Sequence, residues 1–124
     1  MKQYLVDTSI IVDYLRQNER AASFLNSLKP VIISMITAGE IYQGAKDKKE
    51  LRSIKELFQF FKILPINESI SHLSLKLLEK YVLPSGLLIF DSIIAATAMQ
   101  NDLTLLTGNL KHFKIIKGLK VEKW

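Results

Sequence analysis

The sequence predicts an α/β protein: a three-layer α/β/α fold around a central, mostly parallel sheet of four to five strands. Short apolar runs rich in β-branched residues alternate with longer segments of helical periodicity, which is the pattern of βαβ units. The strand-like runs also lack a strict apolar–polar alternation, as expected where helices cover both faces of a sheet. A chain of 124 residues fits one domain over residues 1–124.

The expected elements follow one another along the chain. We expect strands at residues 3–6, 30–34, 62–66, 103–107 and 113–117, and a last extended piece at 120–124. We expect helices at residues 9–17, 19–28, 35–46, 49–61, 68–81 and 87–100. Asn67 can cap the helix that follows it. Pro84 and Gly86 interrupt the chain after that helix, and Asp102 lies in a tight turn before the fourth strand.

The composition narrows the classes of function. With 48% hydrophobic and 23% charged residues, the chain is typical of a folded domain, and no apolar run reaches the roughly 18–20 residues of a membrane span. The apolar start of the chain is interrupted by Asp7 and Asp13 and shows no secretory leader, so we expect a cytoplasmic protein. The absence of cysteine excludes disulfides, thiolate catalysis and cysteine-based zinc sites. The net charge of +5 favours an anionic partner such as nucleic acid.

Three carboxylates are expected at one edge of the sheet. Asp7 directly follows the first strand, and sites in open parallel sheets form beyond the carboxyl ends of the strands. Glu40 lies about six residues beyond the end of the second strand, on the same side of the sheet. The helix that carries Asp91 returns antiparallel to the fourth strand, so Asp91 comes to lie near Asn109, just after that strand.

The surroundings of these acids indicate a metal site. Each acid stands among apolar residues, as in "LIFDSII" around Asp91. Three carboxylates packed together repel one another and resist ionisation, and a divalent cation removes that conflict. Because carboxylate oxygens are the ligands that Mg²⁺ and Mn²⁺ prefer, we predict that Asp7, Glu40 and Asp91 bind Mg²⁺ or Mn²⁺. Such a site suits hydrolysis of a phosphodiester.

Four segments of the chain resemble PIN domains, and most closely the VapC-type ribonuclease toxins of toxin–antitoxin pairs. They are "LVDTSIIVDYL", "ISMITAGEIYQGA", "LLIFDSIIAATAMQNDLTLLTGNLKHF" and the closing "I" with "GLKVEKW", in the order and spacing of the family. The resemblance implies a PIN-like fold and a metal-dependent endoribonuclease. It also implies a homodimer with an RNA substrate and no membrane association, held inactive by a small antitoxin protein.

The resemblance also assigns residues. It implies that Asp7, Glu40 and Asp91 are the acids of the site, and that the fourth polar catalytic position, often aspartate in the family, falls on Asn109. Because Asn109 is neutral, it can offer an amide oxygen or hold a water but cannot be a charged ligand. The hydroxyls that match supporting positions belong to Thr8, Ser9 and Thr107.

Other interpretations of these acids stay open at this point. Asp7 could be the N-cap of the first helix, Glu40 could face solvent, and Asp91 could pair with a distant lysine or arginine. We expect Asp13 to face solvent or to cap locally, and Asp47 and Asp102 to be turn residues. We interpret His72 as structural, and His112 as a surface residue or a contact to phosphate. The basic run over residues 46–55 is either a solvated helix face or a contact to RNA phosphates.

Two other functions compete with the nuclease. A haloacid-dehalogenase-type phosphatase needs a second acid two residues after Asp7, where the chain has Ser9. A catalytically weak PIN-like module that binds RNA or protein without cutting is the alternative that the neutral Asn109 keeps open.

Overall fold

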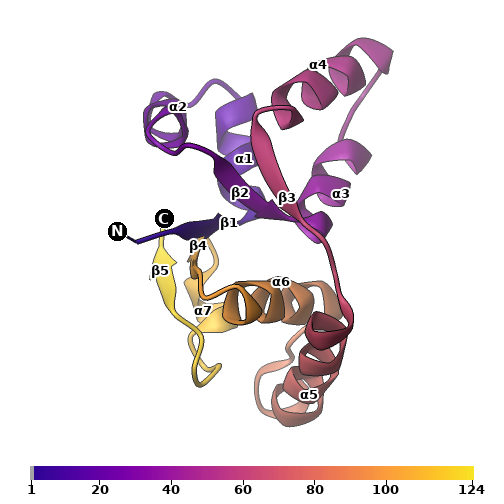
Figure 1. Cartoon of the computed structure of the whole chain (residues 1–124), viewed down its shortest axis with the longest axis vertical. Coiled ribbons are helices and arrows are strands. Elements are labelled where there is room, and N and C mark those ends of the chain that lie inside the picture. The colour runs from indigo at the N-terminus through magenta and orange to yellow at the C-terminus, as the bar shows by residue number, and fades with distance from the viewer. Residues whose placement is uncertain (1) are drawn as a thin grey trace.

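The computed structural model describes residues 2–124 and contains a five-stranded sheet in the order β3-β2-β1-β4-β5 (Figure 1). The strands are β1 (Tyr4–Val6), β2 (Val31–Ser34), β3 (Phe61–Leu64), β4 (Thr104–Thr107) and β5 (Val121–Lys123). All four strand pairs are parallel. The helices are α1 (Thr8–Leu15), α2 (Glu19–Asn26), α3 (Met35–Gln43), α4 (Lys48–Phe58), α5 (Glu68–Ser85), α6 (Ile89–Gln100) and α7 (Leu110–Phe113). The predicted α/β class with a parallel sheet is confirmed.

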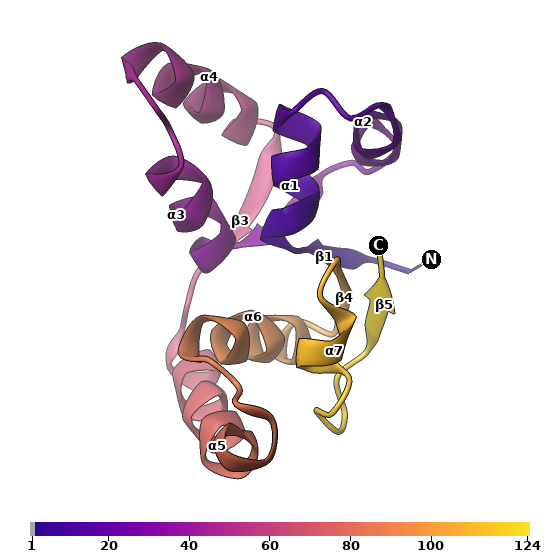
Figure 2. The ribbon, with the colours of Figure 1, turned by 180° about the vertical axis from the view of Figure 1, so that it is seen from behind.

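Successive residues of the central strands serve opposite layers. Leu5 and Leu105 are fully buried against residues of α5 and α6, whereas their neighbours Val6 and Leu106 pack against residues of α1 to α4. Because side chains alternate across a strand, one three-residue strand contributes to both cores. Figures 1 and 2 show the result: α1 to α4 lie on one side of the sheet and α5 to α7 on the other.

Side-chain caps explain where several helices begin. Asn18, Ser34 and Asp47 each accept a hydrogen bond from the backbone N–H three residues later, and so start α2, α3 and α4. Asn67 does the same for α5, as predicted. Such caps satisfy N–H groups that have no partner within the helix. Asp47, which we expected in a turn, is therefore the N-cap of α4.

The predicted strand at residues 113–117 is wrong. Phe113 ends the short helix α7, and Phe113 and Ile116 are both buried in the core on the α5–α6 side. Their apolar character reflects packing rather than strand pairing, because Gly118, with φ of +87°, turns the chain before it pairs. The fifth strand is Val121–Lys123, within the extended piece predicted at 120–124, and it pairs with β4.

Helix α5 runs four residues beyond its predicted end. Pro84 lies inside its last turn, where the proline ring costs a single hydrogen bond and its fixed φ suits a helix. Gly86 ends the helix in the left-handed conformation at φ of +68°, and its N–H donates to the Val82 carbonyl at 2.8 Å. The glycine, not the proline, is the stop signal here.

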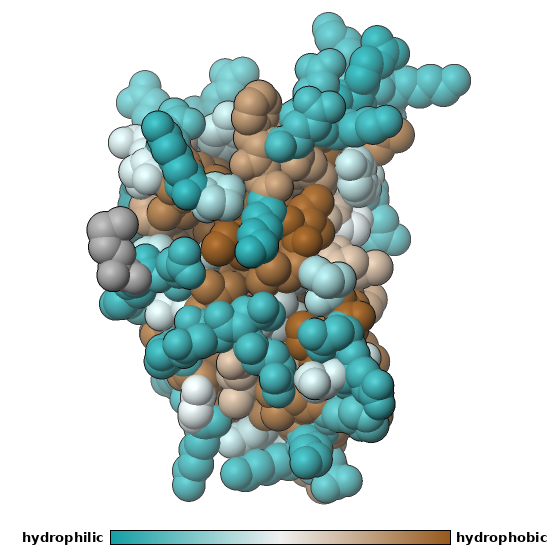
Figure 3. Space-filling model, viewed as in Figure 1, coloured by the Kyte–Doolittle hydropathy of each residue, from teal (hydrophilic) through white to brown (hydrophobic). Residues whose placement is uncertain are grey.

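The exterior carries most of the charge. Hydrophilic side chains project over α4 in Figure 3, and Lys48, Lys49, Arg52 and Lys55 on that helix are all exposed. Apolar surface shows through the middle of the same face. Across residues 2–124, no helix combines the length and apolar character that crossing a membrane requires.

Candidate active site

Asp7 lies where the carboxyl ends of β1 and β4 meet, at the centre of the sheet. Its backbone N–H donates to the Leu106 carbonyl at 2.9 Å, which continues the pairing of the two strands. One carboxylate oxygen accepts the Thr8 N–H at 2.8 Å, and the other accepts the Thr107 hydroxyl at 2.6 Å. Asp7 is only 6% exposed. The N-cap interpretation and the site interpretation of Asp7 are therefore compatible, because the carboxylate starts α1 at the edge where the site was predicted.

Glu40 is tied to the same edge through Thr8. The Thr8 hydroxyl donates to Glu40 Oε1 at 2.6 Å and lies 3.1 Å from the Thr37 hydroxyl. Thr8 begins α1, whereas Thr37 and Glu40 belong to α3. Glu40 is partly buried rather than fully solvated. A single hydroxyl thus connects the first turn of α1 to the acid on α3.

Asp91 stands in the first turn of α6, and its side chain is 25% exposed. Burial raises the pKa of the Asp91 carboxyl above its usual value. The negative charge of Asp7 raises that pKa further, and the charge of Glu40 adds to the same effect, while His112 opposes it. Asp7 and Glu40 are therefore both near enough to Asp91 to influence its ionisation.

His112, which is close to the site in the sequence, lies beside Asp91 in the structure. Its Nδ1 lies 3.6 Å from Asp91 Oδ2, and its side chain is 47% exposed. His112 is therefore partly at the surface, as expected, and partly in contact with Asp91. No lysine or arginine among residues 2–124 forms an ion pair with Asp7, Glu40 or Asp91. His112 stands three residues after Asn109, on the segment that follows β4, and this spacing is what indicates that it lies near the site.

The segment after β4 is held by the hydroxyls of Ser9 and Thr107. Asn109 donates its backbone N–H to Thr107 Oγ1 at 3.0 Å, and Gly108 donates its N–H to Ser9 Oγ at 3.2 Å. A Cβ atom at Gly108 would lie 3.0 Å from Ser9 Oγ, so the two segments touch closely. Asn109 itself is exposed. The structure thus brings Asn109 to the edge where Asp7 lies.

Comparison with known proteins assigns the family. Residues 4–118 match the PIN domain. The chain belongs to the PIN-domain family. It is 33% identical to Ribonuclease VapC1 of Methanocaldococcus jannaschii, over 94% of this chain and 85% of the relative. It is 30% identical to Ribonuclease VapC10 of Mycobacterium tuberculosis, over 94% and 90% of the two chains.

Solved structures agree with this assignment. The structure of VapBC2 from Rickettsia felis, bound to a DNA fragment from their promoter, contains a chain that superposes with a TM-score of 0.82 at 26% identity, covering 98% of each chain. A toxin–antitoxin complex from Klebsiella pneumoniae gives a TM-score of 0.80 at 32% identity, covering 94% of this chain and 95% of that one. The PIN-like fold expected from the resemblance is confirmed.

The acids of this PIN domain suit a hard divalent cation by their chemistry. In the part of the chain that the structure describes, these three carboxylates have no lysine or arginine partner, and burial and repulsion from Asp7 and Glu40 disfavour the ionised form of Asp91. Within residues 2–124, however, no three acidic or histidine side chains are close enough together to form a ready ligand cluster. The three carboxylates of this PIN domain thus lie near one another but do not form a preassembled set of metal ligands.

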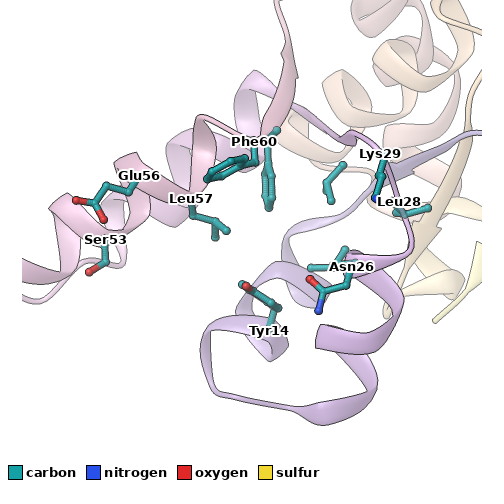
Figure 4. A pocket seen from close by; sticks show the side chains of 11 residues that line it. Tyr14, Asn26, Leu28, Lys29, Ser53, Glu56, Leu57 and Phe60 are labelled. Atoms are coloured by element: carbon teal, nitrogen blue, oxygen red, sulfur yellow. The ribbon is translucent and has the colours of Figure 1, made fainter.

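Two depressions lie on the helical layer formed by α1 to α4. A groove of about 760 Å³ adjoins the site, because Glu40 lines it together with Arg16, Lys46 and Lys49. A separate pocket of about 420 Å³ is lined by residues of α2 and α4 and by Phe60, in the turn before β3 (Figure 4). None of the predicted site residues lines this second pocket. Of these two depressions, the first adjoins the acids and the second lies away from them.

Proposed function

We propose that this PIN domain is a Mg²⁺- or Mn²⁺-dependent endoribonuclease, the toxin of a toxin–antitoxin pair, with residues 1–124 acting as one nuclease domain. The observation that carries the proposal is the grouping of Asp7, Glu40 and Asp91 near one sheet edge, with no lysine or arginine partner within residues 2–124. Relatives that share 30–33% identity over 94% of the chain are named ribonucleases. Because such a protein acts on cellular RNA, we place it in the cytoplasm.

The roles of the residues follow from their contacts. Asp7, Glu40 and Asp91 would hold the ion, and a bound Mg²⁺ or Mn²⁺ would polarise the phosphodiester and lower the pKa of attacking water. The hydroxyls of Thr107 and Thr8 fix the orientation of Asp7 and Glu40, as supporting groups commonly do for ligating carboxylates.

Two further side chains complete the proposed catalytic set. Asn109 offers a neutral amide from the exposed end of β4, suited to a water or a substrate oxygen. The half-exposed ring of His112 faces Asp91, and we propose that it donates a hydrogen bond to the phosphate of the substrate.

The groove beside Glu40 supports RNA as the substrate. Arg16, Lys46 and Lys49 line it, and cationic side chains supply most of the sequence-independent affinity for a phosphate backbone. We propose that the RNA backbone follows this groove toward the acids. The exposed basic residues of α4 then extend the same surface.

We also propose an antitoxin partner and self-association. The related structures from Rickettsia felis and Klebsiella pneumoniae are toxin–antitoxin complexes. Phe60 is 77% exposed and lines the pocket of Figure 4 with Leu57 and Tyr14, which gives an antitoxin an apolar anchor point. A second exposed apolar set lies around the end of α5 and the start of α6, and we assign it to the homodimer: Leu75, Val82, Leu83, Leu88, Ile89 and Phe90.

A module that binds RNA without cutting it is the second candidate. Two observations favour it: the neutral Asn109 at the fourth polar position, and the lack of a closed ligand cluster within residues 2–124. Cleavage itself separates the two functions.

The experiment compares the native chain with Asp7→Asn and Asp91→Asn on labelled structured RNA. We expect cleavage in millimolar Mg²⁺ or Mn²⁺, none in EDTA, and none with either variant although both stay folded. Asp102→Asn, a change at an exposed residue paired with Lys120, is the control and should cleave normally. RNA binding without cleavage by the native chain would establish the binding module instead. Undiminished cleavage by both site variants would refute the site assignment.

A further inference from the structure

We propose that Trp124 is a positioning residue for this site: it fixes Thr107, and through Thr107 the carboxylate of Asp7. The inference rests on the proposed function, since it concerns the geometry of a proposed metal ligand. Trp124 immediately follows β5, the edge strand beside β4. Trp124 is not part of the proposed catalytic set, and two groups of contacts connect it to Asp7.

The backbone makes the first connection. The Trp124 N–H donates to the Thr107 carbonyl at 2.8 Å, and Thr107 is fully buried at the end of β4. The hydroxyl of the same threonine donates to Asp7 at 2.6 Å. Two hydrogen bonds on opposite sides of Thr107 therefore link the chain after β5 to the acid after β1.

The side chain of Trp124 makes the second connection, to the helical layer. Its Nε1–H donates to Asp13 Oδ2 at 3.2 Å. Its ring packs against Phe24 with centroids 5.3 Å apart, and the Arg20 guanidinium lies 4.0 Å from the ring centroid, a distance typical of a cation–π contact. Asp13, which we expected to face solvent or to cap locally, is instead the acceptor for the indole.

These contacts close a ring through the site. Asp7 caps α1, α1 carries Asp13, Asp13 binds the Trp124 indole, and Trp124 binds Thr107, which returns to Asp7. Every link is a hydrogen bond or a helix, so the position of the Asp7 carboxylate is fixed from both sides. Because β5 has only three residues, the contacts of the indole add to the few that hold its end. Releasing the indole should therefore free Thr107 to tilt.

The experiment measures cleavage and metal binding in Trp124→Ala and Trp124→Phe, with Lys123→Ala as the matched control on the adjacent exposed residue. Misplacing a catalytic group by about 1 Å can cost about 100-fold in rate. For Trp124→Ala we expect kcat to fall about tenfold or more with little change in KM. We also expect the Mg²⁺ concentration for half-maximal thermal stabilisation to rise. Trp124→Phe, which keeps the ring but loses the indole N–H, should fall between Trp124→Ala and the native chain.

The decisive readout is a double-mutant cycle with Thr107→Val. If Trp124 acts through Thr107, Trp124→Ala should lower kcat much less in the Thr107→Val background than in the native chain. A purely structural role would lower Tm and leave both kcat per folded molecule and the Mg²⁺ midpoint unchanged. That result, or additive effects in the cycle, would overturn the inference while the proposed function stands.

Two further outcomes keep the test decisive. Should Trp124→Ala fail to fold, Trp124→Phe and Asp13→Ala carry the test. Both remove the indole hydrogen bond; Trp124→Phe keeps an aromatic ring beside Phe24, and Asp13→Ala leaves the whole indole in place. Native kcat and a native Mg²⁺ midpoint in both would overturn the inference. A native chain that neither cleaves RNA nor gains stability from Mg²⁺ would overturn the proposed function, and the inference with it.

Discussion

The Thr107 hydroxyl donates a 2.6 Å hydrogen bond to the Asp7 carboxylate, across a separation of 100 residues in the sequence. Both side chains are buried, Thr107 completely and Asp7 to all but 6%. A buried carboxylate oxygen that loses its donor cannot replace it easily with water. The pair therefore connects the stability of the sheet centre to the geometry of the proposed site.

Thr107→Val should damage both properties. Valine has nearly the shape of threonine and suits a strand, but it leaves the Asp7 oxygen without this donor. We expect the free energy of unfolding to fall by about 1–3 kcal/mol and cleavage to fall about 10–100-fold. Urea denaturation and RNA cleavage measure the two effects.

Thr104→Val is the control for that change. Thr104 is buried in the same strand, and within residues 2–124 its hydroxyl makes no hydrogen bond to a protein group. We expect near-native stability and cleavage. Equal damage from the two variants would show that valine in β4, rather than the lost contact to Asp7, causes the effect.

The position of Asp7 followed from the sequence because it depends on local rules. An acid directly after a buried parallel strand lies at the carboxyl edge of the sheet whatever the remaining packing does. The antiparallel return of α6 along β4 likewise placed Asp91 from element lengths alone. Those two inferences needed only periodicity and the order of elements.

The contacts that the sequence did not reveal are those made between distant segments. Asp13 binds an indole 111 residues away, and His112 faces Asp91 from α7, a short helix that was not predicted. The apolar residues Phe113 and Ile116 suggested pairing, whereas they anchor a turn in the core. Periodicity in so short a segment cannot distinguish these outcomes.

Thr8→Val should impair cleavage with little loss of stability. The Thr8 hydroxyl orients Glu40 at 2.6 Å, but both residues are partly exposed, so water can replace the lost contact. We expect a change of about 1 kcal/mol or less in unfolding free energy and a loss of about 10–100-fold in cleavage. Thr8→Ser keeps the hydroxyl and should restore most of the activity. Native cleavage by Thr8→Val would disprove the supporting role of this hydroxyl.

Asp91→Asn should stabilise the metal-free protein while abolishing cleavage. The pKa of Asp91 is raised in the folded chain by burial and by Asp7, so above the folded pKa its negative charge opposes folding. Removing that charge should raise Tm in EDTA at neutral pH, on the order of 3 °C for a chain of this size. Mg²⁺ should then stabilise the native chain but not the variant.

Asp47→Asn is the control for this measurement. Asp47 is an exposed N-cap of α4, where asparagine caps equally well, so Tm should change little. A fall in Tm for Asp91→Asn in EDTA would contradict the view that repulsion at the site costs stability.

Phe60→Ser should weaken antitoxin binding and spare cleavage. Phe60 is 77% exposed, so the fold loses little when its ring is removed, whereas a partner that covers the ring loses an apolar anchor. We expect about tenfold weaker association or more with the antitoxin that neutralises this chain, measured by calorimetry. Leu51→Ser, an exposed apolar position on α4 outside the pocket, should bind as the native chain does. Equal weakening by both variants would exclude the pocket as the specific contact.

Leu83→Glu should convert the proposed homodimer into a monomer. Leu83 is 93% exposed, and Leu88, Ile89 and Phe90, which follow it closely in the sequence, are each more than half exposed. Exposed apolar side chains in such number favour an interaction surface. Light scattering should give twice the mass of the chain for the native protein and the mass of one chain for the variant, with unchanged circular dichroism. Leu51→Glu, on the opposite helical layer, should remain dimeric. A native protein that is monomeric at micromolar concentration would refute the assignment of these residues to a homodimer interface.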